Sequence, residues 1–116
     1  MVCNRVDDLL AGNVEEILIC GPVLMEVLAG GRNARELEIL RRFLARATII
    51  PTLPVDYESA AELYRRCRRR GETVRKLIDC LIAAVAIRTG IAVLHNDRDF
   101  EVLARHTDLQ VDLVGS

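Results

Sequence analysis

Aromatic residues are scarce in this sequence, which has no tryptophan and is only 3% aromatic overall. Proteins that bind single-stranded nucleic acid without sequence preference stack successive bases on aromatic side chains. We therefore do not expect base stacking to be the main binding mode of this chain. The sequence is nevertheless 51% hydrophobic, so its core must be built from Leu, Ile, Val and Ala. A chain of 116 residues with this composition can form one domain with a sizeable core.

A strong net charge, paired cysteines and long apolar runs are missing as well. The net charge of −1 gives no overall attraction to nucleic acid or membrane, so electrostatic recognition must be local. The 4 cysteines have no Cys-x-x-Cys spacing and only 2 histidines accompany them, which argues against a zinc or redox site. No apolar run approaches the roughly 20 residues of a membrane span, and no secretory signal is recognisable. These absences predict a cytoplasmic protein with reduced, buried thiols and no membrane contact.

Short apolar segments alternate with longer helical patterns along the chain. Strands are expected at residues 17–20, 48–50, 91–95 and 111–114. Helices are expected at residues 5–11, 22–29, 34–47, 57–70, 74–89 and 97–106. The expected N-caps of the last three helices include Asp56 and Thr73. Strands that alternate with helices indicate an α/β domain with a parallel sheet flanked by helices.

Four carboxylates occupy positions that point to a shared site. Asp79 lies in "LIDCLIAAVAI", a helical segment that is apolar on nearly every side, and a buried carboxylate costs several kcal/mol unless it is paired or metal-bound. Glu26 lies in "PVLMEVLAG", in the helix that follows the first expected strand. Asp97 and Asp99 come directly after the strand at residues 91–95. Ligand sites of parallel sheets lie at the carboxyl ends of the strands, so we expect these acids to converge.

Each acid also has a purely structural explanation. Asp79 could pair with an arginine of a neighbouring helix, and Glu26 could occupy an exposed helix position. Asp97 could cap the following helix, and Asp99 could interact with its dipole. Four converging carboxylates, however, repel one another unless a cation neutralises them. Oxygen ligands without His or Cys select Mg²⁺ or Mn²⁺, and such a metal typically acts on phosphates, so we expect phosphodiester or phosphoryl hydrolysis.

Two long segments of the chain resemble the PIN-domain ribonucleases, specifically the VapC toxins of bacterial toxin–antitoxin pairs. The segments are "PVLMEVLAGG" and "GETVRKLIDCLIAAVAIRTGIAVLHNDRDFEVLA", in this order. The resemblance covers nearly the whole chain and implies a PIN-like three-layer α/β domain that cleaves RNA. It implies that Glu26, Asp79 and Asp97 bind Mg²⁺ (or Mn²⁺), and that Asp99 joins them in the catalytic site. It also implies two protein partners, a cognate antitoxin and a second copy of the chain in a homodimer.

One feature of these toxins is not recognisable in the sequence. VapC-like chains open with a strand that ends in Asp-Thr or Asp-Ser and supplies the first metal-binding acid. Nothing before residue 17 reads as such a strand, and Asp7 and Asp8, in an expected helix, are poor substitutes. We therefore expect residues 1–116 to form a single, N-terminally incomplete PIN-like domain. The alternative to a nuclease is then a non-catalytic domain that still binds an antitoxin or dimerises.

Residues 65–76 form a basic run, "RRCRRRGETVRK", in which Glu72 is the only acid. Such a run is commonly a solvated helix end, because arginine is favoured near a helix C-terminus. It directly precedes the helix that carries Asp79, so it could also supply phosphate contacts. The predicted RNA-binding residues are Arg68, Arg69, Arg70, Arg75 and Lys76. A phosphatase-like α/β domain is the least favoured alternative, because Lys76 is the only lysine and lies on an expected helix instead of after a strand.

Overall fold

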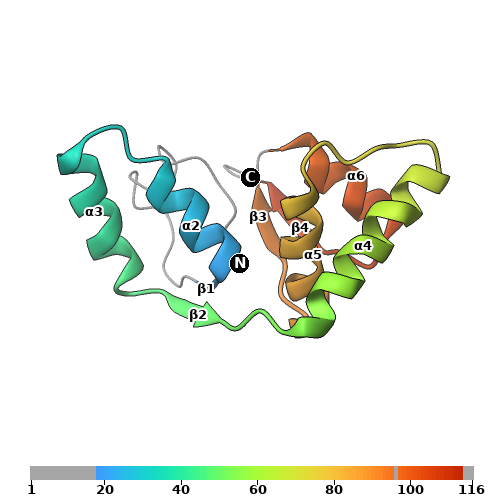
Figure 1. Cartoon of the computed structure of the whole chain (residues 1–116), viewed down its shortest axis with the longest axis horizontal. Coiled ribbons are helices and arrows are strands. Elements are labelled where there is room, and N and C mark those ends of the chain that lie inside the picture. Colours follow the sequence, from blue (N-terminus) through green and yellow to red (C-terminus); the bar gives the residue numbers. More distant parts are fainter. Residues whose placement is uncertain (1–17, 96, 114–116) are drawn as a thin grey trace.

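The computed structural model of the chain describes residues 18–95 and 97–113. Its elements are β1 (Leu18–Cys20), α2 (Gly21–Ala29), α3 (Ala34–Leu44), β2 (Thr48–Ile50), α4 (Pro54–Arg69), α5 (Leu77–Thr89), β3 (Val93–His95), α6 (Arg98–His106) and β4 (Val111–Leu113) (Figure 1). This order confirms the predicted α/β alternation of short strands and helices. The helix expected at residues 5–11, with Asp7 and Asp8, lies outside the described residues.

All strand pairs in the described residues are parallel, as predicted. β1 pairs with β2, with Cys20 opposite Ile50, and β3 pairs with β4, with Val93 opposite Val111. Among the described residues, these four strands form two two-stranded ladders. Figure 1 shows β1 and β2 with α2 and α3 on one side of the molecule, and β3 and β4 with the other helices on the opposite side. Hydrophobic patterns predict strands, but they do not say which strands pair.

Helix α5 is the centre of the core. Its residues 82–86 are all buried, and it packs most extensively against α4 and also contacts α2 and α6. A helix that is apolar on nearly every side must be covered on nearly every side, so the sequence predicted this burial correctly. The core also includes Ile19 and Val23 from the first half of the chain, and Phe100 and Leu103 from α6.

The start of α4 shows why local signals misplace a helix boundary. Asp56 was expected as the N-cap, but the helix begins at Pro54 and Leu53 takes the cap position. Asp56 instead accepts the Leu53 backbone N–H at 2.7 Å and the Arg88 Nε at 2.8 Å. Burial opposes ionisation of Asp56, but its hydrogen bonds from Arg88 and from the Leu53 N–H prevail and lower its pKa. Asp56 therefore links the start of α4 to the end of α5.

The start of α5 was also predicted wrongly. Thr73 is not an N-cap, and the helix begins at Leu77 with Lys76 in the cap position. Lys76 is extended, with φ −118° and ψ 115°. The backbone N–H groups of Arg75 and Lys76 each donate to the Asp99 carboxylate at 3.0 Å. This carboxylate holds the segment extended, and it lies too far away in sequence for a capping pattern to reveal it.

The cysteines behave as small hydrophobic residues. Cys20, Cys67 and Cys80 are buried and carry free thiols, as predicted, whereas Cys3 lies outside the described residues. None of the helices in the described part of the chain is both long and apolar enough to cross a membrane.

Candidate metal centre

The turn from β3 into α6 positions two of the candidate acids. Asp97 is the N-cap of α6, and its Oδ1 accepts the backbone N–H of Asp99 at 2.8 Å. The structural explanation for Asp97 is therefore correct, but it uses only one carboxylate oxygen. The Asp97 side chain keeps 33% of its surface exposed, whereas the Asp99 side chain is only 1% exposed. Asp97 lies at the rim of the site and Asp99 at its base.

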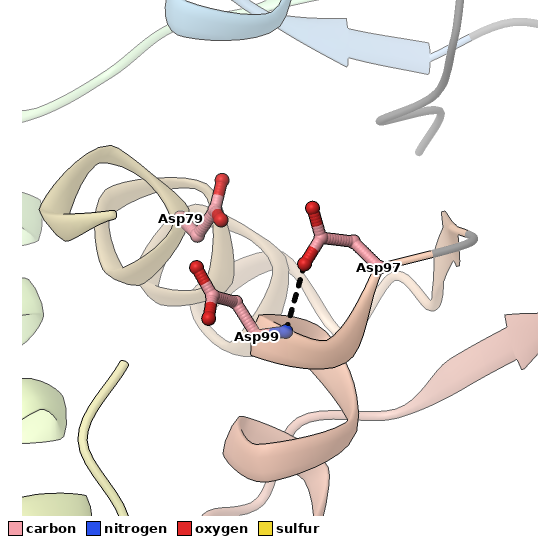
Figure 2. Close-up of side chains that lie close together, drawn as sticks. All are labelled: Asp79, Asp97 and Asp99. Carbon is pink, nitrogen blue, oxygen red and sulfur yellow. Dashed lines mark hydrogen bonds between the residues drawn. The ribbon is translucent and has the colours of Figure 1, made fainter. Parts of the chain in front are cut away.

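Asp79 joins these two acids from the first turn of α5. Asp79, Asp97 and Asp99 each place one carboxylate oxygen within 4.8 Å of the others (Figure 2). Asp79 is only 3% exposed, and its Oδ2 atom has no hydrogen-bond partner among the described residues. The alternative of an ion pair between Asp79 and an arginine is not observed in the described part of the chain. The packing of α5 against α6 thus gathers three acids at the carboxyl end of β3.

The two most buried carboxyl groups differ strongly in their affinity for a proton. Burial raises the pKa of Asp79 to about 8, and a hydrogen bond with Asp99 and the charges of Asp99, Asp97 and Glu26 add to this effect. Burial acts in the same direction on Asp99, but hydrogen bonds from the Arg75 and Lys76 N–H groups and from Asp79 outweigh it and lower the Asp99 pKa. Without a cation at neutral pH, Asp79 therefore keeps its proton and Asp99 carries the negative charge.

Among the described residues, Arg75 is the cationic side chain that forms ion pairs with this cluster. Its Nε atom lies 3.4 Å from Asp99 Oδ1, and its Nη2 atom lies 3.6 Å from Asp97 Oδ1. In the described part of the chain, Lys76 contacts the site through its backbone N–H. Both residues are predicted to bind RNA, and their contacts with Asp99 were not expected from the sequence. No local sequence signal could have revealed contacts between residues 23 and 24 positions apart.

Glu26 is not part of the tight cluster. It lies in α2 and is partly buried, and its negative charge contributes to the raised pKa of Asp79. α2 packs against α5, which brings this charge toward the site. The structure thus gathers Asp79, Asp97 and Asp99 closely, and places Glu26 near enough to act on Asp79 through its charge.

The basic run ends in a loop that is tied to α6. Glu72 accepts hydrogen bonds from Arg105 at 2.6 Å and forms a 2.8 Å contact with His106. The hydrogen bond from Arg105, followed by that with His106, lowers the pKa of Glu72 to about 2. The exposed residues 68–70 show no contact with the three acids among the described residues, and a shallow cavity of about 380 Å³ is lined by Arg65, Arg68 and Arg69. Their role in RNA binding therefore stays a prediction.

The donor atoms of this cluster fit a hard divalent cation. All three are carboxylate groups, and the buried Oδ2 of Asp79 is an oxygen without a hydrogen bond in the described residues. His95 is buried close by in sequence and its Nδ1 accepts the Asp97 N–H at 3.1 Å, but among the described residues its ring is not part of the three-acid group. Burial lowers the pKa of His95 and so favours its neutral form. Oxygen ligands of this kind suit Mg²⁺ or Mn²⁺ better than zinc or copper.

Comparison with known proteins finds relatives over most of the chain. The sequence pattern of the family described as "PIN domain" matches residues 3–106. Ribonuclease VapC11 of Mycobacterium tuberculosis is 43% identical over 110 residues, which cover 91% of this chain and 80% of the relative. Ribonuclease VapC6 of the same species is 30% identical over 103 residues, covering 84% of this chain and 79% of the relative.

Solved structures of toxin–antitoxin complexes share the fold. VapBC2 from Rickettsia felis, bound to a promoter DNA fragment, matches with a TM-score of 0.71 and 21% identity, over 97% of this chain and 98% of that chain. DNA-bound VapBC from Salmonella typhimurium matches with a TM-score of 0.71 and 21% identity, over 93% of this chain and 83% of that chain. The family pattern spans most of the chain, and VapC11 is 43% identical to it. The chain therefore belongs to the PIN-domain family and, within it, to the VapC ribonucleases.

Proposed function

We propose that this protein is a metal-dependent ribonuclease that acts as the toxin of a toxin–antitoxin pair in the cytoplasm. The observation that carries the proposal is the convergence of three carboxylates within 4.8 Å at the end of β3. The similarity to proteins named as ribonucleases supports RNA as the substrate. The structural likeness to VapBC complexes supports a cognate antitoxin as partner, and the resemblance to the VapC toxins leads us to expect a homodimer.

The three aspartates, together with Glu26, would hold Mg²⁺ or Mn²⁺. When bound, such a cation lowers the pKa of an attacking water and neutralises negative charge on the phosphate. The protein contributes carboxylates whose orientation is already set. Asp99 is held by the two backbone N–H groups of residues 75 and 76, and Asp97 by its cap hydrogen bond. Preorganised ligands need less reordering when the metal binds. Loss of a hydrogen bond that holds a metal ligand in place typically lowers metal affinity or activity about 10- to 100-fold.

Asp79 has a further role as the group that releases a proton. Its pKa of about 8 means that it is mostly protonated at neutral pH without a cation. A carboxylate must be deprotonated to bind a metal, so metal binding should release this proton. We therefore expect metal affinity and cleavage to rise with pH until Asp79 is ionised.

Cleavage of RNA by the purified protein tests the proposal. The wild-type protein should cleave RNA with Mg²⁺ or Mn²⁺ and should lose this activity with a chelator. Asp79→Asn and Asp97→Asn should each reduce cleavage at least about a hundredfold, because both remove a direct ligand. Asp108→Asn, which changes an exposed acid outside the cluster, should have no effect.

One result would overturn the catalytic proposal. If the wild-type protein binds Mn²⁺ and a cognate antitoxin but cleaves no RNA under any of these conditions, the chain is a non-catalytic binding domain. If Asp79→Asn and Asp97→Asn retain full activity, the acids identified here are not the catalytic ones.

A further inference from the structure

Arg75 makes an unusual set of contacts with the acid cluster. Its backbone N–H donates to Asp99 Oδ1 at 3.0 Å, and its Nε atom lies 3.4 Å from the same oxygen. Its Nη2 atom lies 3.6 Å from Asp97 Oδ1. One residue therefore holds Asp99 through its backbone and also brings a positive charge against two of the three candidate metal ligands.

The backbone and side-chain contacts of Arg75 differ in strength. Charge-assisted hydrogen bonds of arginine are commonly about 2.7–2.9 Å long. Arg88 meets Asp56 at 2.8 Å and Arg105 meets Glu72 at 2.6 Å, so this chain forms such bonds elsewhere. The guanidinium of Arg75 stays at 3.4 and 3.6 Å, and its side chain is 62% exposed. The backbone of Arg75 is anchored at the site, whereas its guanidinium is only loosely attached.

We propose that Arg75 is a displaceable counter-cation: it neutralises the acid cluster when no metal is bound, and it moves to the RNA phosphate when a metal binds. This inference rests on the proposed metal-dependent nuclease. Asp97 and Asp99 repel each other without a cation, and the guanidinium offsets part of that repulsion. A divalent ion on the same oxygens repels the guanidinium. The backbone anchor then keeps the freed side chain within reach of the phosphate at the site, and arginine binds phosphate in a bidentate manner.

The proposal predicts opposite changes in metal affinity and in cleavage. Arg75→Met removes the charge but keeps the backbone N–H and much of the apolar stem. Mn²⁺ should bind this variant about three- to tenfold more tightly, because the metal no longer competes with an arginine–carboxylate attraction between unit charges roughly 4 Å apart in a solvent-exposed setting. RNA cleavage should nevertheless fall at least about tenfold in kcat/KM at saturating Mn²⁺, because the phosphate contact is lost. A residue that only supported the fold would lower both quantities together.

Two further variants control the experiment. Arg75→Lys keeps the positive charge without the planar fork, so its Mn²⁺ affinity should stay close to that of the wild type while cleavage falls. Arg98→Met removes the same charge from an exposed position that lies between Asp97 and Asp99 in sequence. Arg98 forms no ion pair with these acids among the described residues. Its Mn²⁺ affinity should change clearly less than that of Arg75→Met.

The measurements are Mn²⁺ titration by electron paramagnetic resonance without RNA, and cleavage of RNA by the same preparations after circular dichroism has confirmed folding. If Arg75→Met binds Mn²⁺ no more tightly than Arg98→Met does, Arg75 is not a counter-cation. If Mn²⁺ affinity rises but cleavage is unchanged, the transfer to the phosphate is wrong. If the wild type binds Mn²⁺ but does not cleave RNA, the proposed nuclease function fails while the Mn²⁺ titrations still decide the counter-cation role.

Discussion

Replacing Asp79 by Asn should stabilise the metal-free protein, and the gain should grow as the pH rises from 5 to 8. Asp79 is 3% exposed, and its pKa is raised from the ordinary value of 3.8 to about 8. Between these two values the folded protein keeps the Asp79 proton while the unfolded chain releases it. The free energy of unfolding therefore falls with rising pH in this window, because the unfolded state binds fewer protons. Asn carries no ionisable proton, so the variant escapes this loss.

The size of the stability difference follows from the interval between the unfolded and folded pKa values of Asp79. Each pH unit between the two pKa values costs about 1.4 kcal/mol, and the loss levels off as the pH approaches the folded pKa. The wild type should therefore lose about 3 kcal/mol between pH 5 and pH 8 relative to Asp79→Asn. The amide N–H of Asn can also donate to Asp99, as protonated Asp79 does, so the hydrogen bond is retained.

Urea unfolding with a chelator, followed by circular dichroism at pH 5, 6, 7 and 8, measures this difference. Asp108→Asn is the matched control, because it removes an exposed acid, and its effect should stay within about 0.5 kcal/mol at every pH. A difference between wild type and Asp79→Asn that does not grow with pH refutes the assignment of the proton to Asp79. Mn²⁺ at about 100 times its dissociation constant should stabilise the wild type by about 2.7 kcal/mol and the variant much less.

Three further outcomes are expected. Alanine at residues 68–70 should weaken RNA binding. It should also reduce the slope of log affinity against log salt concentration by about one for each lost phosphate contact, which RNA binding at several salt concentrations measures. Arg88→Met should destabilise the protein by about 2–3 kcal/mol in urea unfolding, because it leaves the buried Asp56 without its partner. Asp97→Asn should lower Mn²⁺ affinity at least about tenfold with little change in stability, because Asn can still accept the helix-capping N–H of Asp99. Unchanged Mn²⁺ affinity would mean that Asp97 is only a cap.

Several features of this protein follow from the sequence because they depend on local pattern. α5 is apolar on nearly every side and is buried, as its pattern predicts. Parallel strands lie within the short apolar segments predicted at residues 48–50 and 91–95. Asp79 and Asp99 are candidate site acids from the sequence, and both are almost fully buried in one cluster. The PIN-family resemblance came from the same residues, and the comparisons confirm it.

Other features depend on contacts between distant segments and needed the tertiary structure. Among the described residues, the pairing of β1 with β2 and of β3 with β4, and the position of Glu26 outside the tight cluster, depend on contacts between distant segments. The start of α5 at Leu77 follows from the Asp99 carboxylate, which takes the N–H groups of residues 75 and 76. A capping pattern reads only neighbouring residues, and it assigned the start of the helix to Thr73. Sequence patterns therefore revealed which acids needed a partner, whereas only long-range packing decided which groups they meet.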